Sequence, residues 1–382
     1  MKALQFVKSF SLLSETFIYD YVKELERQGV ENHVVTFNRK NAETRSFPRV
    51  ELVERPSRWH PRRLWHRSLV PFGMGESRTS DWPLIRNRLL SKVRAINPDV
   101  IHAHFGPTGV LIAPVAKAAQ VPLVVSFHGF DAFQLPNEEF WRSKYKTLFE
   151  GVSRVTVVSD VMYDHLVSIG APSEKVEVVH VGKRMDDYPF RKPSSPVRRW
   201  ISVGRLAEKK GYGDCIAAFR KHVEKFPDST LDIIGDGEKR AELEKQILNK
   251  NLEGKARLHG RRPHEEVKAY MRDADGFVLC SKEAEDGNRE GIPTVLMEAQ
   301  AIGLPVVATH HSGIPEVIPE EQHDLLAPEG NTDIIAARLN TVASQTVNEL
   351  TQIAERGRQK MKREFSLSSE VKALRDTYHT SE

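Results

Sequence analysis

Cysteine is scarce in this chain, which has only Cys215 and Cys280 among its 382 residues. Two cysteines do not make the disulfide framework of a small secreted scaffold, and both stand in apolar contexts typical of buried free thiols. Long apolar runs are also missing, because no stretch approaches the roughly 20 residues that a membrane-spanning helix needs. Residues 1–7 lack the apolar length and the cleavage site of a signal peptide. We therefore expect a protein of the reducing cytoplasm.

A strong excess of charge of either sign is absent as well, with 56 Lys and Arg against 52 Asp and Glu. A nucleic-acid-binding protein is usually more basic than this, so we expect no nucleic-acid partner. The hydrophobic content of 40% and charged content of 28% are those of a globular protein. A length of 382 residues favours two domains of ordinary size.

The basic excess is concentrated in residues 39–94, which hold 14 basic and 5 acidic side chains. Within this region, residues 55–67 combine Trp59 and Trp65 with the arginines Arg55, Arg58, Arg62, Arg63 and Arg67. Arginine together with tryptophan suits a membrane–water interface with anionic lipids, or a phosphorylated lipid-linked acceptor. A solvated basic loop explains the pattern equally well. Our hypothesis is peripheral contact of residues 55–67 with an anionic membrane, on its inner face.

Two motifs are present only in part. Gly235 and Gly237 begin a dinucleotide-binding fingerprint, but Arg240 stands where the third glycine is needed. This departure weighs against a nicotinamide-dependent oxidoreductase. Asp273 and Asp275 are spaced like ligands of a divalent metal, but they precede a predicted strand and so lie far from its carboxyl end. We therefore expect no metal at these aspartates.

Strand-like and helix-like patterns alternate throughout the chain and restart in its second half. A segment rich in proline, serine and charge, residues 186–196, separates the two series. The expected strands include residues 2–7, 33–37, 100–104, 123–127, 155–159, 176–180, 200–204 and 276–280. Such alternation predicts an α/β fold with parallel, doubly wound sheets.

The clearest chemistry follows the predicted strand at residues 276–280. A polar loop leads to Glu290, and a buried helix that carries Glu298 comes directly after it. Ligands of open α/β sheets bind outside the carboxyl ends of strands, where this loop lies. Ionised Glu298 only accepts hydrogen bonds, so two neighbouring sugar hydroxyls would suit it. A solvated acidic loop before a capped helix is the plainer interpretation.

The start of the same helix is suited to an anion such as a diphosphate. Pro293 fits the first turn, where a missing N–H has no consequence. Free N–H groups are then expected at the neighbouring residues Gly291, Ile292 and Thr294.

A second loop with basic side chains follows the predicted strand at residues 200–204. Gly204 is followed by Arg205, and Lys210 stands before Gly211 at the start of the next helix. Two cations at a strand's end are able to clamp a diphosphate, Arg205 as a planar fork and Lys210 as a point charge. Basic loops are common, so these two cations alone do not identify a diphosphate site.

These two loops closely resemble the donor-site motifs of glycosyltransferase family 4, the retaining nucleotide-sugar transferases of GT-B fold. The sequence segments at residues 285–293 and 13–18 resemble those of the exopolysaccharide and colanic-acid branch of that family. The resemblance implies two Rossmann-like domains that face a cleft. We expect an acceptor-side domain at residues 1–188 and a nucleotide-sugar-binding domain at 189–364. A C-terminal helix at 365–382 is then expected to cross back to the first domain.

The resemblance also implies roles for individual residues. Glu290 would contact the transferred sugar and Glu298 the ribose, while Arg205 and Lys210 would stabilise the departing diphosphate. Family members place the base near residues 257–261, which brings in Arg261. Enzymes of this kind work without a metal or another cofactor. The expected donor-binding residues are Gly204, Arg205, Lys210, Arg261, Glu290, Gly291, Ile292, Pro293, Thr294 and Glu298.

In the first half, the pair His128 and Gly129 matches a family motif that faces the transferred sugar, and His104 resembles a nearby segment with weaker specificity. A lone histidine at a strand's end is more often structural. The acceptor-side residues Ser14, Glu15 and Thr16 look like the first strand–helix loop of polysaccharide-assembling members. A plain helix cap explains Ser14 equally well.

The sequence thus predicts transfer of a hexose from a nucleotide diphosphate sugar to a sugar or lipid-linked saccharide, with retention, in bacterial exopolysaccharide or lipopolysaccharide biosynthesis. The catalytic set would be Glu290, His128, Arg205 and Lys210. One alternative is another GT-B enzyme, such as a sugar-nucleotide epimerase or hydrolase. The other is a non-catalytic nucleotide-sugar-binding module, which the intact set of charged residues argues against.

Overall fold

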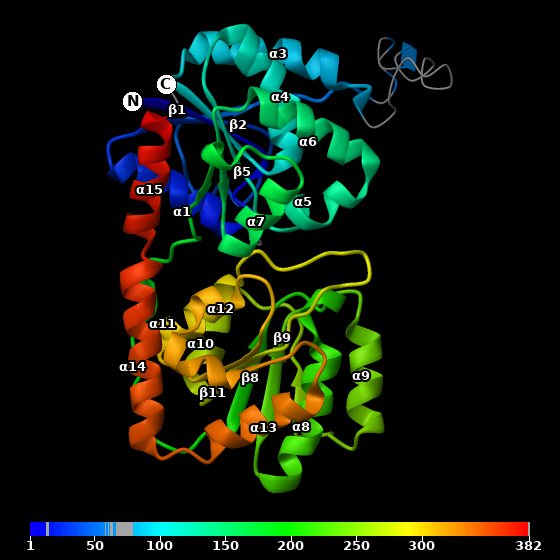
Figure 1. The fold of residues 1–382 in the computed structure, drawn as a ribbon, viewed down its shortest axis with the longest axis vertical. Coiled ribbons are helices and arrows are strands. Elements are labelled where there is room, and N and C mark those ends of the chain that lie inside the picture. The colour runs from blue at the N-terminus through cyan, green and yellow to red at the C-terminus, as the bar shows by residue number, and fades with distance from the viewer. Residues whose placement is uncertain (13–14, 58, 60, 62–63, 66–78, 381–382) are drawn as a thin grey trace. The chain divides into compact units, whose positions relative to one another are not determined.

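The computed structural model describes residues 1–12, 15–57, 59, 61, 64–65 and 79–380. The chain divides into two compact units (Figure 1). Unit 1 comprises Met1–Val157, Tyr163–Val179 and Glu370–Glu382, and unit 2 comprises Val158–Met162 and His180–Ser369. Each unit is built on a parallel sheet flanked by helices, as the alternating pattern predicts.

Unit 1 contains a seven-stranded sheet in the order β3-β2-β1-β4-β5-β6-β7, and all of its neighbouring strands are parallel. The strands are β1 (Lys2–Phe10), β2 (Glu31–Arg39), β3 (Val50–Leu52), β4 (Val100–His104), β5 (Leu123–Ser126), β6 (Arg154–Val157) and β7 (Val176–Val178). The strand order reverses between β1 and β4, and ligands of open parallel sheets bind at such a switch point.

The helices of unit 1 connect these strands and protect both faces of the sheet. They are α1 (Thr16–Arg27), α3 (Trp82–Ile96), α4 (Gly106–Ala119), α5 (Phe130–Phe133), α6 (Glu139–Gly151), most of α7 (Asp160–Ser168) and the later part of α15 (Leu367–His379). In α15, the Tyr378 hydroxyl lies 2.7 Å from His102 Nδ1 and accepts a hydrogen bond from Gln5 Nε2. The C-terminal helix therefore returns to the first sheet, as the sequence predicts.

Unit 2 contains a six-stranded parallel sheet in the order β10-β9-β8-β11-β12-β13. Its strands are β8 (Arg199–Val203), β9 (Thr230–Ile234), β10 (Ala256–Leu258), β11 (Gly276–Leu279), β12 (Val306–Thr309) and β13 (Leu326–Ala327). The order reverses between β8 and β11. The two loops with the predicted donor-site motifs follow these two strands, so the topology brings them to one edge of the sheet.

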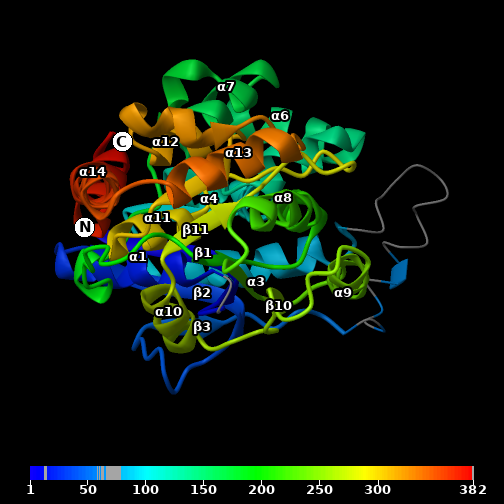
Figure 2. The same ribbon diagram turned by 90° about the horizontal axis from the view of Figure 1, so that it is seen from below.

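Buried apolar side chains such as Trp200, Ile216 and Phe219 form the core of unit 2. Its helices are α8 (Tyr212–Lys225), α9 (Arg240–Asn249), α10 (His264–Asp273), α11 (Thr294–Ile302), α12 (Ile314–Val317), α13 (Thr332–Ala343) and α14 (Val347–Glu364). Helices α8 and α13 lie side by side (Figures 1 and 2). A capping box of Thr346 and Glu349 begins α14, because each side chain satisfies a backbone N–H that has no helical partner.

The start of α11 differs slightly from the prediction. Its first helical residue is Thr294, and Pro293 is the N-cap rather than part of the first turn. Within the described ranges, no helix combines the length and the apolar character that crossing a bilayer requires.

Candidate functional site

The loop after β8 and the loop after β11 meet through an ion pair. The short 3₁₀ turn Glu208–Lys210 ends at Gly211, which has a left-handed backbone with φ of 61°. Lys210 Nζ lies 2.9 Å from Glu290 Oε1, and Lys209 Nζ lies 3.9 Å from Glu290 Oε2. Lys209 Nζ also donates to the carbonyl oxygen of Arg289 at 3.0 Å. Two predicted site residues, Lys210 and Glu290, are therefore in contact.

The Glu290 carboxylate is buried, and its pKa reflects two opposed effects. Burial raises the pKa of Glu290, but the Lys210 and Lys209 ammonium groups lower it by more, so the pKa is lowered overall. Glu290 Oε1 has no well-aligned hydrogen-bond donor among the described residues, so its attraction to Lys210 is chiefly between charges. Glu290 is thus an ionised carboxylate beside a cationic loop.

The backbone of Glu290 is held by the turn that follows β12. Its N–H donates to His311 Nε2 at 3.2 Å, and its carbonyl oxygen accepts from Ser312 Oγ at 2.6 Å. His311 Nδ1 lies 2.6 Å from Glu329 Oε1, so the proton on that ring nitrogen faces the carboxylate. Ser312 therefore anchors the Glu290 loop. Sequence reasoning did not assign this anchoring to His311 or Ser312.

The second carboxylate of the motif lies in α11 and has a partner that sequence reasoning missed. Lys183 Nζ donates to Glu298 Oε1 at 2.6 Å, and each side chain is only 8% exposed. The two residues are 115 positions apart, so no local spacing signals their pairing.

The remaining predicted donor residues include two arginines and the residues at the start of α11. Arg205 and Arg261 are exposed, and neither forms an ion pair with any residue that the structure describes. Gly291, Ile292 and Thr294 precede or begin α11. Their N–H groups donate no hydrogen bond within the described chain, so they are available to an anion.

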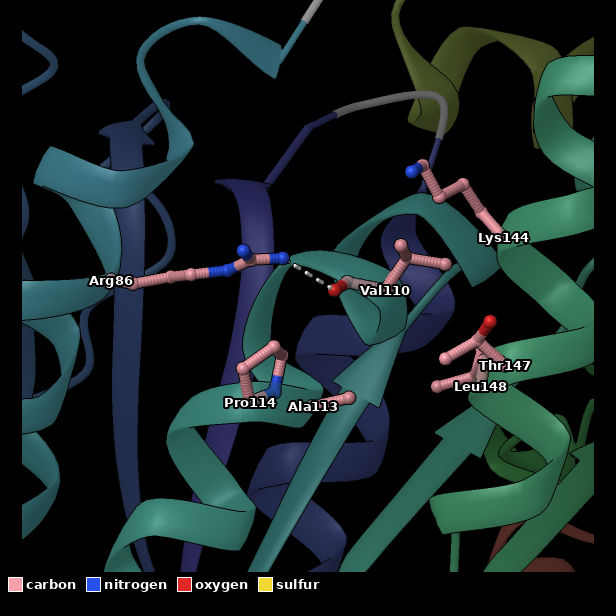
Figure 3. Close-up of a pocket in the computed structure, with 7 residues that line it drawn as sticks. All are labelled: Arg86, Val110, Ala113, Pro114, Lys144, Thr147 and Leu148. Atoms are coloured by element: carbon pink, nitrogen blue, oxygen red, sulfur yellow. Dashed lines mark hydrogen bonds between the residues drawn. The ribbon is translucent and has the colours of Figure 1, made fainter. Parts of the chain in front are cut away.

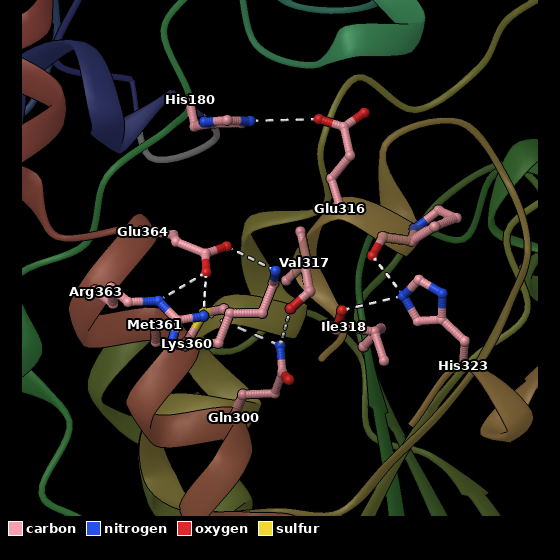
Figure 4. A network of polar contacts seen from close by, with 11 residues as sticks. His180, Gln300, Glu316, Val317, Ile318, His323, Lys360, Met361, Arg363 and Glu364 are labelled. Atoms are coloured by element: carbon pink, nitrogen blue, oxygen red, sulfur yellow. Dashed lines mark hydrogen bonds and ion pairs between the residues drawn. The ribbon is translucent and has the colours of Figure 1, made fainter. Parts of the chain in front are cut away.

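Polar contacts of α12 restrain the chain just after the turn that follows β12 (Figure 4). One carboxylate oxygen of Glu316 lies 3.3 Å from His180 Nε2. Both carboxylate oxygens also accept from the N–H of Asp160 at 3.1 Å. Gln300 of α11 donates to the carbonyl oxygen of Val317 at 3.0 Å. These contacts connect α11, α12 and the start of the His180 segment within unit 2.

In unit 1, one buried carboxylate organises the loop that contains His128 and Gly129. Asp131 accepts hydrogen bonds from the N–H groups of Gly106 at 2.9 Å and of His128 and Gly129 at 3.0 Å. Burial raises the pKa of Asp131 and the backbone donors lower it in part, with the net result that it is raised to about 6. An acidic residue three positions after His128 is a local signal for this turn, which the sequence analysis did not use.

The His128 ring lies between two aromatic rings, with centroids 4.8 Å from Phe17 and 4.7 Å from Phe105. Its two nitrogens have no hydrogen-bond partner among the described residues. Burial lowers the pKa of His128 well below its ordinary value, so the ring is neutral and offers one donor and one acceptor. His104 is placed differently, because it is buried and its Nε2 lies 3.1 Å from Gln5 Oε1. Burial lowers the pKa of His104 to about 3.

The predicted acceptor-side corner follows β1. Ser14 lies outside the described residues, and α1 has Glu15 at its N-cap and Thr16 as its first residue. The Glu15 side chain makes no capping hydrogen bond. Burial raises the pKa of Glu15, Lys8 lowers it and Asp131 raises it, with the net result that it is raised to about 6. Glu15 is therefore within electrostatic reach of the loop that holds His128.

A separate hollow of about 190 Å³ lies in unit 1 among α3, α4 and α6 (Figure 3). Arg86 Nη2 donates to the carbonyl oxygen of Val110 at its rim, at 3.4 Å. None of the predicted site residues lines this hollow.

Asp275, one of the two aspartates considered as metal ligands, pairs with Arg199 at 2.9 Å at the amino end of β8. In the part of the chain that the structure describes, no three His, Cys, Asp or Glu side chains cluster as metal ligands.

Comparisons with known proteins agree with this fold. The family model Glycosyltransferase Family 4 matches residues 14–183, and the model Glycosyl transferases group 1 matches residues 190–360. The chain is 31% identical to the putative colanic acid biosynthesis glycosyltransferase WcaL of Escherichia coli (strain K12), with 96% of both chains covered. It is 30% identical to the amylovoran biosynthesis glycosyltransferase AmsK of Erwinia amylovora, again over 96% of both chains.

These matches define a glycosyltransferase. The chain belongs to glycosyltransferase family 4, as the sequence motifs predict. Among solved structures, HepE of Anabaena in complex with UDP has a TM-score of 0.79 at 20% identity, with all of both chains covered. The apo lipopolysaccharide outer core galactosyltransferase WaaB has a TM-score of 0.74 at 15% identity, also over all of both chains. These structures confirm the GT-B fold.

Proposed function

We propose that this protein transfers a hexose from a nucleoside diphosphate sugar to a saccharide or lipid-linked saccharide during assembly of a bacterial exopolysaccharide. The observation that carries the proposal is the Lys210–Glu290 ion pair at the switch point of the unit 2 sheet. The names of WcaL and AmsK support the polymer class. HepE, with structures in complex with UDP, with UDP and glucose and with UDP-glucose, supports UDP as the first nucleotide to test.

In the proposed reaction, the bond between the anomeric carbon and the β-phosphate oxygen breaks. The acceptor hydroxyl oxygen bonds to the anomeric carbon, and its proton passes to the departing phosphate. Negative charge therefore develops on the diphosphate. Arg205, Lys210 and the free N–H groups at the start of α11 are proposed to stabilise that charge. Because these groups are cationic or donate hydrogen bonds, we propose that the reaction needs no added metal.

The two carboxylates of unit 2 are proposed to orient the donor. Glu290 would accept hydrogen bonds from hydroxyls of the sugar, and Glu298 from hydroxyls of the ribose. For His128, the family resemblance implies contact with the transferred sugar, and its neutral ring with two unpartnered nitrogens suits a hydroxyl group. Retention at the anomeric carbon belongs to the same proposal.

The test starts with thermal shifts in UDP, GDP, ADP and dTDP and their common sugars, with and without EDTA. One nucleotide series is expected to raise the melting temperature, because a ligand that binds only the folded state stabilises it. The best donor is then incubated with a lipid-linked saccharide, and NMR of the product reports the anomeric configuration.

Several outcomes would contradict the proposal. Donor consumption at the same rate without an acceptor would indicate an epimerase or hydrolase. Donor binding without any turnover would indicate a binding module. Activity lost with EDTA and restored by a divalent metal would overturn the metal-independent mechanism, and an inverted product would overturn retention.

We also propose peripheral membrane contact through residues 55–67. Trp59 and Trp65 are 81% and 62% exposed, as anchors at a lipid interface would be. Arg55 is paired with Asp81 at 2.7 Å, and Arg58, Arg62, Arg63 and Arg67 lie outside the described residues.

Vesicles that contain anionic lipid are expected to co-sediment the protein at low salt, and the double variant Trp59→Ala/Trp65→Ala should lose most of this binding. Leu248→Ala, which removes an exposed apolar side chain in unit 2, is the matched control and should bind like the wild type. No sedimentation of the wild type, or equal sedimentation of both variants, would reject the contact.

A further inference from the structure

Lys183 and Glu298 form a buried ion pair within unit 2. Lys183 Nζ and Glu298 Oε1 are 2.6 Å apart, and both side chains are 8% exposed. Removing two charges from water offsets much of their mutual attraction, so a buried pair is a poor source of stability compared with apolar packing. The presence of this pair at a proposed ligand-binding carboxylate therefore points to a function in binding.

The backbone around Lys183 is fixed by the segment that follows α14. The N–H of Lys183 donates to the carbonyl oxygen of Phe365 at 2.9 Å, and the N–H of Leu367 donates to the carbonyl oxygen of Lys183 at 2.9 Å. A Cβ atom at Gly182 would lie 2.6 Å from Leu367 Cα, so only glycine allows this close approach. The backbone of Lys183 is thus held by hydrogen bonds on both its N–H and its carbonyl oxygen.

The start of the same segment is held as well. His180 Nε2 lies 3.3 Å from Glu316 Oε2 (Figure 4). Glu316 also accepts from the N–H of Asp160. The segment at residues 180–183 is therefore restrained at both ends. A long, flexible lysine side chain gains a defined direction because its backbone has little freedom.

The partner carboxylate is on an equally restrained helix. In α11, Gln300 bonds to the carbonyl oxygen of Val317, and the carbonyl oxygen of Ala301 accepts from Arg358 of α14 at 2.7 Å. Glu298 Oε1 is taken by Lys183, whereas Glu298 Oε2 accepts no hydrogen bond from any described residue. One oxygen is therefore anchored, and the other is free for a ligand.

We infer that Lys183 is a positioning residue that orients Glu298 toward the ribose hydroxyls of the nucleotide. This inference rests on the proposed function, which assigns the ribose to Glu298. By holding Oε1, Lys183 limits rotation of the carboxylate, so that Oε2 accepts from a hydroxyl without further ordering. Pre-organisation of this kind strengthens binding because the side chain has less freedom to lose. Lys183 acts through Glu298 and does not itself touch the reacting atoms.

The test compares ribose with deoxyribose. Binding of UDP and 2′-deoxy-UDP, GDP and 2′-deoxy-GDP, and ADP and 2′-deoxy-ADP is measured by calorimetry for the wild type. The wild type should bind the preferred ribonucleotide about tenfold more tightly than its deoxy form, because a hydrogen bond to a charged group is worth about that much. Lys183→Met should weaken binding of the ribonucleotide and leave the Kd of the deoxy form within about threefold of the wild-type value. The ratio of the two Kd values should therefore fall toward one.

Three further variants make the result specific. Lys183→Arg keeps the charge and should keep most of the ribose preference. Glu298→Gln should abolish the preference for ribose. The double variant Lys183→Met/Glu298→Gln should bind both sugar forms like Glu298→Gln alone, because Lys183 acts through Glu298. The double variant also removes the unpaired buried charge, so it remains informative if Lys183→Met folds poorly. Lys192→Met, which breaks an exposed pair with Glu355 in the same unit, is the matched control.

The outcomes separate this inference from the proposed function. A wild type that binds none of the nucleotides would overturn the proposed function and the inference together. A wild type that binds but does not prefer ribose would overturn only the ribose role of Glu298 and of Lys183. Equal weakening of both sugar forms by Lys183→Met, or an additive effect in the double variant, would overturn the positioning role alone.

Discussion

Lys210→Ala is expected to lower kcat by about 10²–10³-fold while the protein remains folded, since removing one preorganised donor from a developing anion costs about that much. Lys210 Nζ is 2.9 Å from Glu290, in the loop that leads to the free N–H groups of α11. Its charge is therefore placed where a departing diphosphate would lie. Steady-state kinetics with the identified donor measure the effect, and circular dichroism with a thermal melt checks the fold.

Folding of this variant is expected to survive because Lys209 lies 3.9 Å from the same carboxylate and still compensates its charge. Glu290→Gln keeps the shape of the side chain and removes its charge, which separates orientation of the sugar from stabilisation of the diphosphate. Lys221→Ala is the matched control, since it breaks an exposed ion pair with Asp333 elsewhere in unit 2. Lys210→Ala with kcat within tenfold of the wild type would contradict the assigned role.

Gly211→Ala is expected to lower the free energy of unfolding of unit 2 by roughly 3–5 kcal/mol. Gly211 has φ of 61°, and a Cβ atom there would lie 1.7 Å from the carbonyl oxygen of Cys280. That oxygen belongs to the backbone that follows β11, so the clash is relieved only if the loops after β8 and β11 separate. Donor binding should be lost with stability, because Lys210 directly precedes Gly211 and Glu290 lies in the opposite loop.

Gly254→Ala is the control that isolates backbone strain from this clash. Gly254 has a similar left-handed φ of 77°, but a Cβ atom there meets nothing within 4 Å. Gly254→Ala should lower the free energy of unfolding only by the penalty of a left-handed backbone, about 1–2 kcal/mol. The chain has two units and need not unfold in one step, so the comparison uses the transition that a bound nucleotide shifts. Equal losses in the two variants would show that contact with Cys280 contributes nothing.

The sequence determined the elements and the loops that matter. Apolar runs that alternate with amphipathic stretches specified parallel sheets, because strands covered on both faces must be apolar and their crossovers helical. The motifs after β8 and β11 were placed correctly for a local reason: each directly follows its strand, and ligands bind at the carboxyl ends of parallel strands. Glu290, Arg205 and Lys210 could be found as candidates in this way, while their roles remain predictions.

The tertiary structure alone decided the partners of these residues. Lys183 meets Glu298 across 115 positions, and His311 and Ser312 hold the Glu290 backbone from the turn after β12. No spacing rule encodes such contacts, since they depend on strand order and on how closely two loops approach. The first residue of α1, Thr16, also could not be predicted from the sequence, because helix ends are uncertain by one or two residues and Glu15 at the N-cap makes no capping hydrogen bond. Burial likewise made His104 a bonded interior residue and left both nitrogens of His128 unpartnered, although both histidines follow or end strands of the same sheet.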